Sequence, residues 1–297
     1  MGAVGQSEFL LDLFKYIYLQ WSKEEDTVVA PQLAAVGLAT AYIGARGNTK
    51  LQIGKVFLDE DSSEQLMHDN NRQFLQEIQL ISSNDVFELK MASKMFLSDS
   101  FEVLDQFNSK INTFYGSNFE KINFREAFDA ANKINEFART EGNDSDVIKS
   151  EDIERTKIVI VNVAHFHANW GPLIGQFIYK NEEKFQFICV PIGSDNAKLD
   201  LAIVAPKDFL NLPLVLKELK GDKLLDLFTI RQPQKQKLQM ELIRNLNVVI
   251  NAFLDFRDLE GDESFAFFII HNKKNIQFEG SHRIEHRYVK CNPNSTG

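Results

Sequence analysis

Two histidines one residue apart, His165 and His167, have the spacing in this sequence that most resembles metal-site chemistry. On a β-strand, residues i and i+2 share a face, so both imidazoles would point the same way. Two ligands do not make a metal site, because a zinc site needs at least three from the protein. We therefore interpret the pair as structural packing, and we expect no metal site and no cofactor.

Other residue types that carry enzyme chemistry lack the spacing that they need. No serine stands in a Gly-x-Ser-x-Gly elbow, and there is no glycine-rich phosphate loop. His282 and His286 fall in a polar tail, 281–297, that we expect to be flexible. Lys235 and Lys237 could bind an anionic polymer weakly, but a solvated turn is the simpler interpretation. We expect no enzymatic activity.

A short charged link in the C-terminal part says most about function. Eight residues join two apolar runs: Arg257, Asp258, Leu259, Glu260, Gly261, Asp262, Glu263 and Ser264. Fully extended, they reach only ~26 to 29 Å. Burying their charges without partners would cost several kcal/mol. Arg257 could face a trypsin-like protease, but the adjacent Asp258 fits many protease subsites poorly, so we interpret Arg257 as a solvated residue.

Composition places the chain among globular proteins. It has 297 residues, of which 44% are hydrophobic and 25% charged, with a formal net charge of -9. An acidic chain with scattered lysines and arginines is not expected to bind nucleic acid. No apolar run reaches membrane-spanning length, so no membrane partner is expected.

Processing signals are sparse. The first twenty residues lack a basic region followed by an apolar core, so no signal peptide is expected. Cys189 and Cys291 lie in unlike settings, one apolar and one polar, and we expect both thiols to be free. Asn143 and Asn294 begin glycosylation sequons, which matter if the chain is secreted.

Hydrophobic periodicity predicts alternating helices and strands. Helices are expected over residues 7–18 (capped by Ser7), 33–43, 66–81, 101–115, 127–140 and 214–228. Strands are expected over residues 28–31, 87–96, 157–164, 185–192, 199–205, 265–270 and 275–278. The stretch 238–256 is ambiguous. With no repeat and no linker, one α+β domain over residues 1–297 is the natural interpretation.

Four groups of segments, in order along the chain, resemble signatures of the serpin family. They are residues 30–31 with 41–49 and 52–53; 91–96; 134–137 with 156–162 and 166–170; and 265–272 with 278–280. The resemblance implies N-terminal helices packed on a large central mixed β-sheet, with a second sheet. Here the second sheet is expected to be curtailed, because strands at 179–185 and around 232–246 look shortened or lost. The resemblance also marks Pro31, Asn162 and Trp170 as structural residues of the breach and shutter regions.

Departures from the family pattern bear directly on function. The family's Ser-Pro-x-Ser is Ala30-Pro31-Gln32-Leu33 here, so two hydroxyls that would hydrogen-bond beneath the sheet are absent. Residues 251–259 resemble the helical segment that precedes the family's His-bearing strand, and they run almost directly into the closing strand. The resemblance therefore implies that the bait loop has been deleted.

The family's default activity, trapping a serine protease by inserting a cleaved loop into the main sheet, needs length and small residues. The short link argues for a non-inhibitory scaffold or binding protein. Two alternatives stay open: an inhibitor of an extracellular serine protease, and a truncated gene product without independent activity. The partner would be a serine protease or an unidentified protein ligand. The resemblance implies an extracellular location, and the missing signal peptide favours a cytoplasmic one.

Overall fold

The computed structural model describes residues 3–21, 29–58, 63–81, 87–116, 119–142, 146–153, 156–169, 173–191, 200–208, 212–228, 234–240, 245–255 and 266–270. The helices are α1 (Ala3–Trp21), α2 (Pro31–Gly44), α3 (Gly47–Phe57), α4 (Glu64–Leu80), α5 (Asp105–Tyr115), α6 (Ala127–Thr140), α7 (Leu212–Glu218) and α8 (Gly221–Phe228), with a 3-10 turn η1 (Ser150–Ile153). The strands are β1 (Phe87–Ser98), β2 (Phe119–Ile122), β3 (Ile158–Asn169), β4 (Leu173–Asn181), β5 (Phe185–Pro191), β6 (Asp200–Pro206), β7 (Gln234–Met240), β8 (Asn245–Asp255) and β9 (Ala266–Ile270). The expected α+β class is confirmed.

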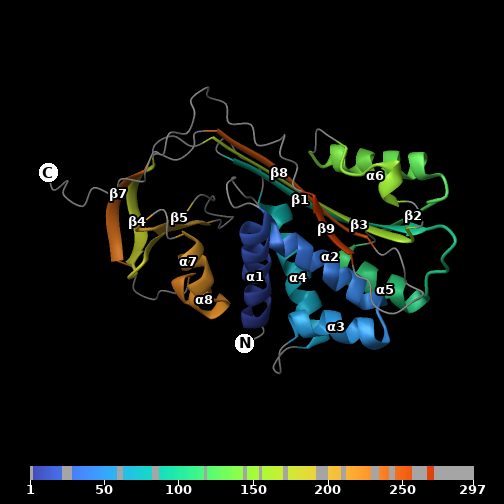
Figure 1. Cartoon of the computed structure of the whole chain (residues 1–297), viewed down its shortest axis with the longest axis horizontal. Coiled ribbons are helices and arrows are strands. Elements are labelled where there is room, and N and C mark those ends of the chain that lie inside the picture. The colour runs from blue at the N-terminus through green and yellow to red at the C-terminus, as the bar shows by residue number, and fades with distance from the viewer. Residues whose placement is uncertain are drawn as a thin grey trace.

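The strands form two sheets. The main sheet has the order β2-β1-β3-β8-β9, and the second has the order β6-β5-β4-β7. The main sheet is mixed, because β2 is parallel to β1 and the other neighbours are antiparallel. Figure 1 shows α2, α4 and α5 on one face of the main sheet, α6 on the other, and α7 and α8 beside the second sheet. The predicted large mixed sheet under N-terminal helices is therefore confirmed.

Strand β3 runs through the middle of the main sheet and is covered on both faces. Ile158 and Ile160 pack with α2, whereas Val159 and Val161 pack with α6. This is why the sequence shows a continuous β-branched run there instead of an apolar–polar alternation. The alternation places every even-numbered residue of β3 from 158 to 164 on the α2 face.

Helix α2 begins two residues earlier than the sequence pattern predicts. Pro31 is its first residue, and Ala30 precedes it without a side-chain cap. The expected strand at 28–31 is wrong for the described residues 29–31, because a proline donates no hydrogen bond to a ladder and suits the first helical turn. The predicted end of this helix at residue 43 is confirmed to within one residue, because α2 ends at Gly44. Helix α3 then starts at Gly47, whose φ of 55° favours glycine, and the sequence pattern did not predict it.

Most other N-terminal elements match the sequence prediction. Helix α6 has the predicted bounds, and α4 begins after Ser63, whose hydroxyl accepts a hydrogen bond from the Leu66 amide. Helix α1 begins at Ala3, so the expected N-cap at Ser7 is wrong and Ser7 lies inside the helix.

Strand β8 is the largest correction to the sequence prediction. Residues 251–255 belong to this strand, so the expected helical segment over 251–259 is wrong for the described part. Eleven residue pairs join β8 to β3, from Val159 with Asp255 to Asn169 with Asn245. The apolar run of β8 shows no clean alternation of apolar and polar residues. The strand pairs with β3, which is distant from it in the sequence. The predicted closing strand is confirmed as β9, and residues 275–278 lie outside the described residues.

The second sheet contains the predicted hairpin of β5 and β6. It also contains β4 as far as Asn181, and β7 from Gln234 to Met240. The expected loss of strands around 232–246 is therefore wrong where β7 and the start of β8 are described. Strand β7 lies at an edge and is rich in Gln and Lys, which hides it from a search for apolar periodicity.

The predicted helix over 214–228 is divided into α7 and α8. Helix α8 begins at Gly221, whose amide donates a hydrogen bond to Glu8 Oε2 of α1. A Cβ at position 221 would lie 2.7 Å from the Glu8 amide nitrogen, so glycine permits this close approach. This hydrogen bond joins α1 to α8, which lies beside the second sheet.

Candidate functional site

Asn162 lies on the α2 face of β3 and is 1% exposed. In the ladder it stands opposite Ser93 of β1 and Ala252 of β8. Neither its Oδ1 nor its Nδ2 has a hydrogen-bond partner among the described residues. A buried polar group without a partner costs ~1 to 3 kcal/mol, so this position weakens the sheet over α2.

The start of α2 offers Asn162 no hydroxyl. Ala30 carries a methyl group, and Leu33 is a buried apolar residue. Pro31 is the first residue of the helix, as described above. The unpartnered amide of Asn162 therefore agrees with the absence of the two hydroxyls noted in the sequence.

A second polar group lies on the same side of the main sheet, between α2, α4 and α5. The Nδ1 atom of His68 is 2.8 Å from the Tyr115 hydroxyl. Tyr115 also hydrogen-bonds the Asn71 side chain, and Gln32 Nε2 donates to Asn71 Oδ1 at 3.1 Å. We call His68, Tyr115, Asn71 and Gln32 the polar network. Gln32 is the member of the network that comes from α2. Its side-chain amide is hydrogen-bonded to Asn71 of α4.

Burial sets the protonation of the polar network. Burial lowers the pKa of the His68 imidazole to about 4. The Nε2 atom of His68 has no hydrogen-bond partner among the described residues, which agrees with a neutral ring. Burial also raises the pKa of Tyr115, and the hydrogen bond from Asn71 offsets only part of that effect. Both side chains are therefore neutral near pH 7.

Three charged side chains lie close enough to His68 of the polar network to act on its pKa. Glu64 on α4 binds Lys50 of α3 and Lys110 of α5, each at 2.9 Å. Burial by itself would raise the pKa of the Glu64 carboxyl, but the hydrogen bonds from the two lysines outweigh it and lower the pKa to about 2. Glu64 therefore stays ionised and holds three helices together.

The histidine pair on β3 lies on the opposite face, towards α6. In the ladder, His165 stands opposite Lys90 and His167 opposite Glu88. The His165 ring packs against Gly142 at the end of α6, where an added Cβ would lie 3.0 Å from Nδ1. Within the described ranges, no three His, Cys, Asp or Glu side chains form a group that could hold a metal ion.

Several predicted site residues cannot be placed. Those that lie outside the described residues are Trp170, Asn143, Asn294, His282, His286, Cys291 and the link residues 257–264. Cys189 is a buried free thiol on β5. No helix in the described part of the chain is both long and apolar enough to cross a bilayer.

The fold and the sequence of this chain resemble those of known proteins. The family model described as "Serpin (serine protease inhibitor)" matches residues 4–172. The chain belongs to the serpin family. The predicted membership is therefore confirmed, and the matched residues include helices α2 to α6 and strand β3 with Asn162.

Individual serpins resemble the chain over different lengths. Serpin B6 of Macaca fascicularis is 24% identical over 276 residues, which is 82% of this chain and 72% of that protein. Ovalbumin-related protein Y of Gallus gallus is 29% identical over 185 residues, which is 57% of this chain and 47% of that protein. The chain therefore matches about half of the ovalbumin-related protein.

Solved structures support the same fold. The structure of emu ovalbumin (Dromaius novaehollandiae) aligns with a TM-score of 0.66 at 18% identity. The alignment covers 93% of this chain and 96% of the emu chain. At this identity the likeness shows a serpin fold and carries no further functional statement.

The polar network was missed by sequence reasoning. Its signal was weak: His68 and Asn71 are three residues apart on the apolar face of a predicted helix. Their partners Tyr115 and Gln32 come from segments 47 and 39 residues away. Such contacts follow from helix packing and leave no local pattern.

Proposed function

We propose that this serpin is non-inhibitory, and that it acts as a scaffold or binding protein and not as a protease trap. The observation that carries the proposal is the continuous pairing of β8 with β3 on one side and with β9 on the other. A cleaved loop that entered the sheet between two paired strands would first have to break the ladder that joins them. Within the described residues, β3 and β8 are joined over eleven pairs, so no gap separates them.

The length of the link supports the proposal. Asp255, the last residue of β8, pairs with Ala266, the first residue of β9, so residues 256–265 begin and end side by side. Ten residues that leave and return to neighbouring strands reach at most ~18 Å from that end of the sheet. A protease would have little chain to engage.

Strand insertion would also need more residues than cleavage can release. A strand that matched the eleven-pair ladder would be ~36 Å long. Cleavage after Arg257 would leave two residues attached to β8, namely Phe256 and Arg257. Five of the ten residues 256–265 are charged, and their burial in the sheet would cost several kcal/mol each without partners.

The alternative function is serine-protease inhibition, which is the activity named in the description of the family model. Its partner would be a serine protease. A truncated product without activity is the third candidate, and it would expose apolar surface and strand edges.

A protease panel separates these functions. The full chain is incubated with trypsin-, chymotrypsin- and elastase-like enzymes, and a denaturing gel is read for a covalent complex. We expect digestion or no reaction. A complex that survives denaturation, with any of the enzymes, would overturn the proposal.

Two further readouts sharpen this test. Trypsin-nicked protein is expected to melt no higher than the intact chain, because it has no second, more stable state. The matched variant Arg257→Gln controls for cleavage at other sites. A large rise in melting temperature that requires Arg257 would indicate loop insertion. Concentration-dependent association of the untreated chain in sedimentation would favour the truncated-product alternative.

A further inference from the structure

Helix α4 has a solvated outer face and an inner face that carries a buried ionisable side chain, His68. Side chains of the outer face pair along the helix: Gln65 donates a hydrogen bond to Asp69, and Gln73 donates one to Glu77. These hydrogen bonds lie within the helix and would move with it. The inner face is therefore what holds α4 against α2 and α5.

The His68 ring lies among three aromatic rings. It stacks on Phe114 with 4.8 Å between centroids, meets Tyr115 edge-on and is tilted against Tyr42 of α2. Its Nδ1 is bonded to the Tyr115 hydroxyl, and its Nε2 has no hydrogen-bond partner among the described residues. A protonated imidazole carries an N–H at both nitrogens. Protonation would thus leave a charged donor against apolar ring surface, and the closed helix favours the neutral ring.

The charged groups around His68 offer the imidazolium no contact. Burial is the largest influence on the His68 pKa and lowers it. Glu64 and Asp69 of α4 raise that pKa, whereas Lys110 of α5 and Lys50 of α3 lower it. The Glu64 carboxylate, one helical turn from His68, is bound by both lysines. Its own pKa of about 2 means that these contacts persist in mild acid.

We propose that mild acid releases α4 from α2 and α5, with the proton taken up at Nε2 of His68 as the trigger and the Glu64 ion pairs as the tether. The closed form binds fewer protons than the open form, so acid favours opening. The effect grows as the pH falls from 6.5 to about 4 and changes no further below that. The uncovered surface is apolar, because Met67, Phe114 and Tyr115 belong to the core cluster. This conformational switch does not depend on whether the serpin inhibits a protease.

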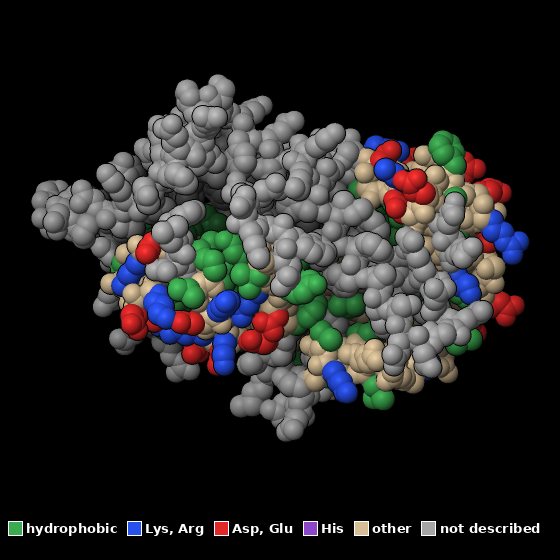
Figure 2. All heavy atoms as spheres, viewed as in Figure 1, with side chains coloured by type: hydrophobic (Ala, Val, Ile, Leu, Met, Phe, Trp, Pro, Cys, Tyr) green, Lys and Arg blue, Asp and Glu red, His purple; other side chains and the backbone are tan. Residues whose placement is uncertain are grey.

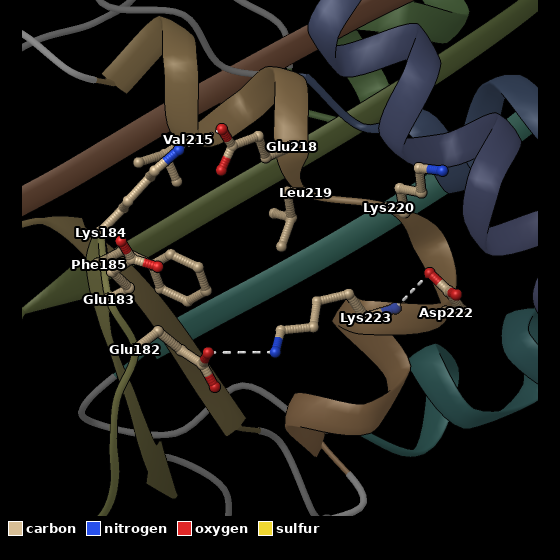
Figure 3. Close-up of a pocket in the computed structure, with 10 residues that line it drawn as sticks. All are labelled: Glu182, Glu183, Lys184, Phe185, Val215, Glu218, Leu219, Lys220, Asp222 and Lys223. Atoms are coloured by element: carbon tan, nitrogen blue, oxygen red, sulfur yellow. Dashed lines mark hydrogen bonds and ion pairs between the residues drawn. The ribbon is translucent and has the colours of Figure 1, made fainter.

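The corner of α7 and α8 provides an internal reference for a test. Figure 2 shows lysine, aspartate and glutamate side chains interspersed over this end of the molecule. Figure 3 shows Lys223 of α8 reaching Glu182, which follows β4, and the two side chains are 3.2 Å apart. Hydrogen bonds from Lys180 and then Lys223 keep the pKa of the Glu182 carboxyl low although burial opposes them. This contact therefore stays mostly charged at pH 4.5, and α8 is not expected to respond.

Hydrogen exchange of the full chain, read by mass spectrometry at pH 7 and pH 4.5, tests the proposal once the intrinsic effect of pH on exchange is removed. The opening equilibrium constant over residues 69–80 is expected to rise roughly 50-fold at pH 4.5. That of α8 is expected to change less than about 3-fold. Between these pH values the rise in α4 should follow the uptake of about one proton per opening. An equal rise in α4 and α8, or no rise in α4, would overturn the proposal.

Variants identify the trigger and the tether. His68→Phe keeps a ring in place and is expected to abolish the acid response of α4. Glu64→Gln is expected to raise opening at both pH values and to keep the acid response. His167→Gln, on the α6 face of β3, is the control and should behave like the unaltered chain. A response that persists in His68→Phe or disappears in Glu64→Gln would contradict the mechanism. The proton uptake is measured on the unaltered chain, so it tests the proposal even where a variant folds poorly.

Discussion

Two buried asparagines on opposite faces of the main sheet differ in what surrounds them. Asn135 on α6 is 3% exposed and makes three hydrogen bonds: its Nδ2 donates to the Ile148 carbonyl, and its Oδ1 accepts from the Val147 and Ile148 amides. Asn162 on β3 is as deeply buried and has no hydrogen-bond partner in the described part of the chain. The same side chain therefore stabilises one face of the sheet and weakens the other.

The difference arises from where the partners come from in the sequence. The partners of Asn135 are backbone groups only 12 and 13 residues away, in a segment that follows its own helix. Backbone carbonyls survive any substitution, and backbone amides survive every substitution except one to proline. For Asn162, the family resemblance implies hydroxyl partners at positions 30 and 33, where this chain has Ala30 and Leu33. His68 is intermediate, because one of its ring nitrogens is bonded and the other has no partner among the described residues.

The largest effect is expected where the hydrogen bonds are complete. Asn135→Leu would leave three buried backbone groups without partners, at ~1 to 3 kcal/mol each. We expect the free energy of unfolding to fall by about 4 kcal/mol, measured by urea denaturation. A loss below about 1 kcal/mol would show that water replaces the side chain and would remove the contrast with Asn162.

The next effect depends on pH and concerns His68. Its pKa is about 4 in the folded chain and 6.5 when unperturbed, so the folded state favours the neutral ring. The stability that this provides is complete above pH 6.5, falls as the pH drops towards 4, and changes no further below that. The loss amounts to at most about 3 kcal/mol.

Urea denaturation at pH 7 and at pH 4.5 tests this effect. The variant His68→Phe keeps a ring against Phe114, whose centroid lies 4.8 Å from that of His68. It is expected to be less stable at pH 7 but to lose less stability on acidification. Glu64 does not disturb the comparison, because its lowered pKa of about 2 places its own loss below pH 4.5. Equal acid losses in both proteins would refute the role of His68.

Tyr115→Phe is expected to cost about 2 kcal/mol. It removes the hydroxyl that joins His68 to Asn71 and leaves both without that bond. Tyr42→Phe is the control. The Tyr42 ring packs beside that of His68, with 6.2 Å between their centroids, but the hydrogen bonds described for the network do not include its hydroxyl. If both variants lose the same stability, ring packing and not the hydroxyl accounts for the effect.

The smallest effect has the opposite sign. Asn162→Val removes two unpartnered polar atoms and places a β-branched residue in a central strand. We expect the free energy of unfolding to rise by about 1 kcal/mol. Ala30→Ser restores one of the missing hydroxyls and is expected to stabilise the chain when Asn162 is present, but not when it is combined with Asn162→Val. A destabilised Asn162→Val chain would mean that Asn162 is bonded after all.

The sequence predicted part of the fold and drew attention to Asn162. The bounds of α6, the extent of α4 and the hairpin of β5 and β6 follow from local periodicity and were predicted. Asn162 and Pro31 were found through the family resemblance. The sequence also shows that positions 30 and 33, where the family pattern has serines, carry Ala and Leu. Strand β8 was missed, because a continuous apolar run has no period that separates a strand from a helix.

What the sequence determined by itself is local: the helices with an apolar stripe, the β-branched run of β3, the charges of the link at 257–264 and the loss of two hydroxyls beneath the sheet. What only the tertiary structure decided is which distant groups meet. It pairs β8 with β3, brings Tyr115 to His68, and sets Lys223 across from Glu182. The physical reason is that periodicity and capping depend on neighbours in the chain, whereas ladder partners and buried hydrogen bonds depend on how whole elements pack.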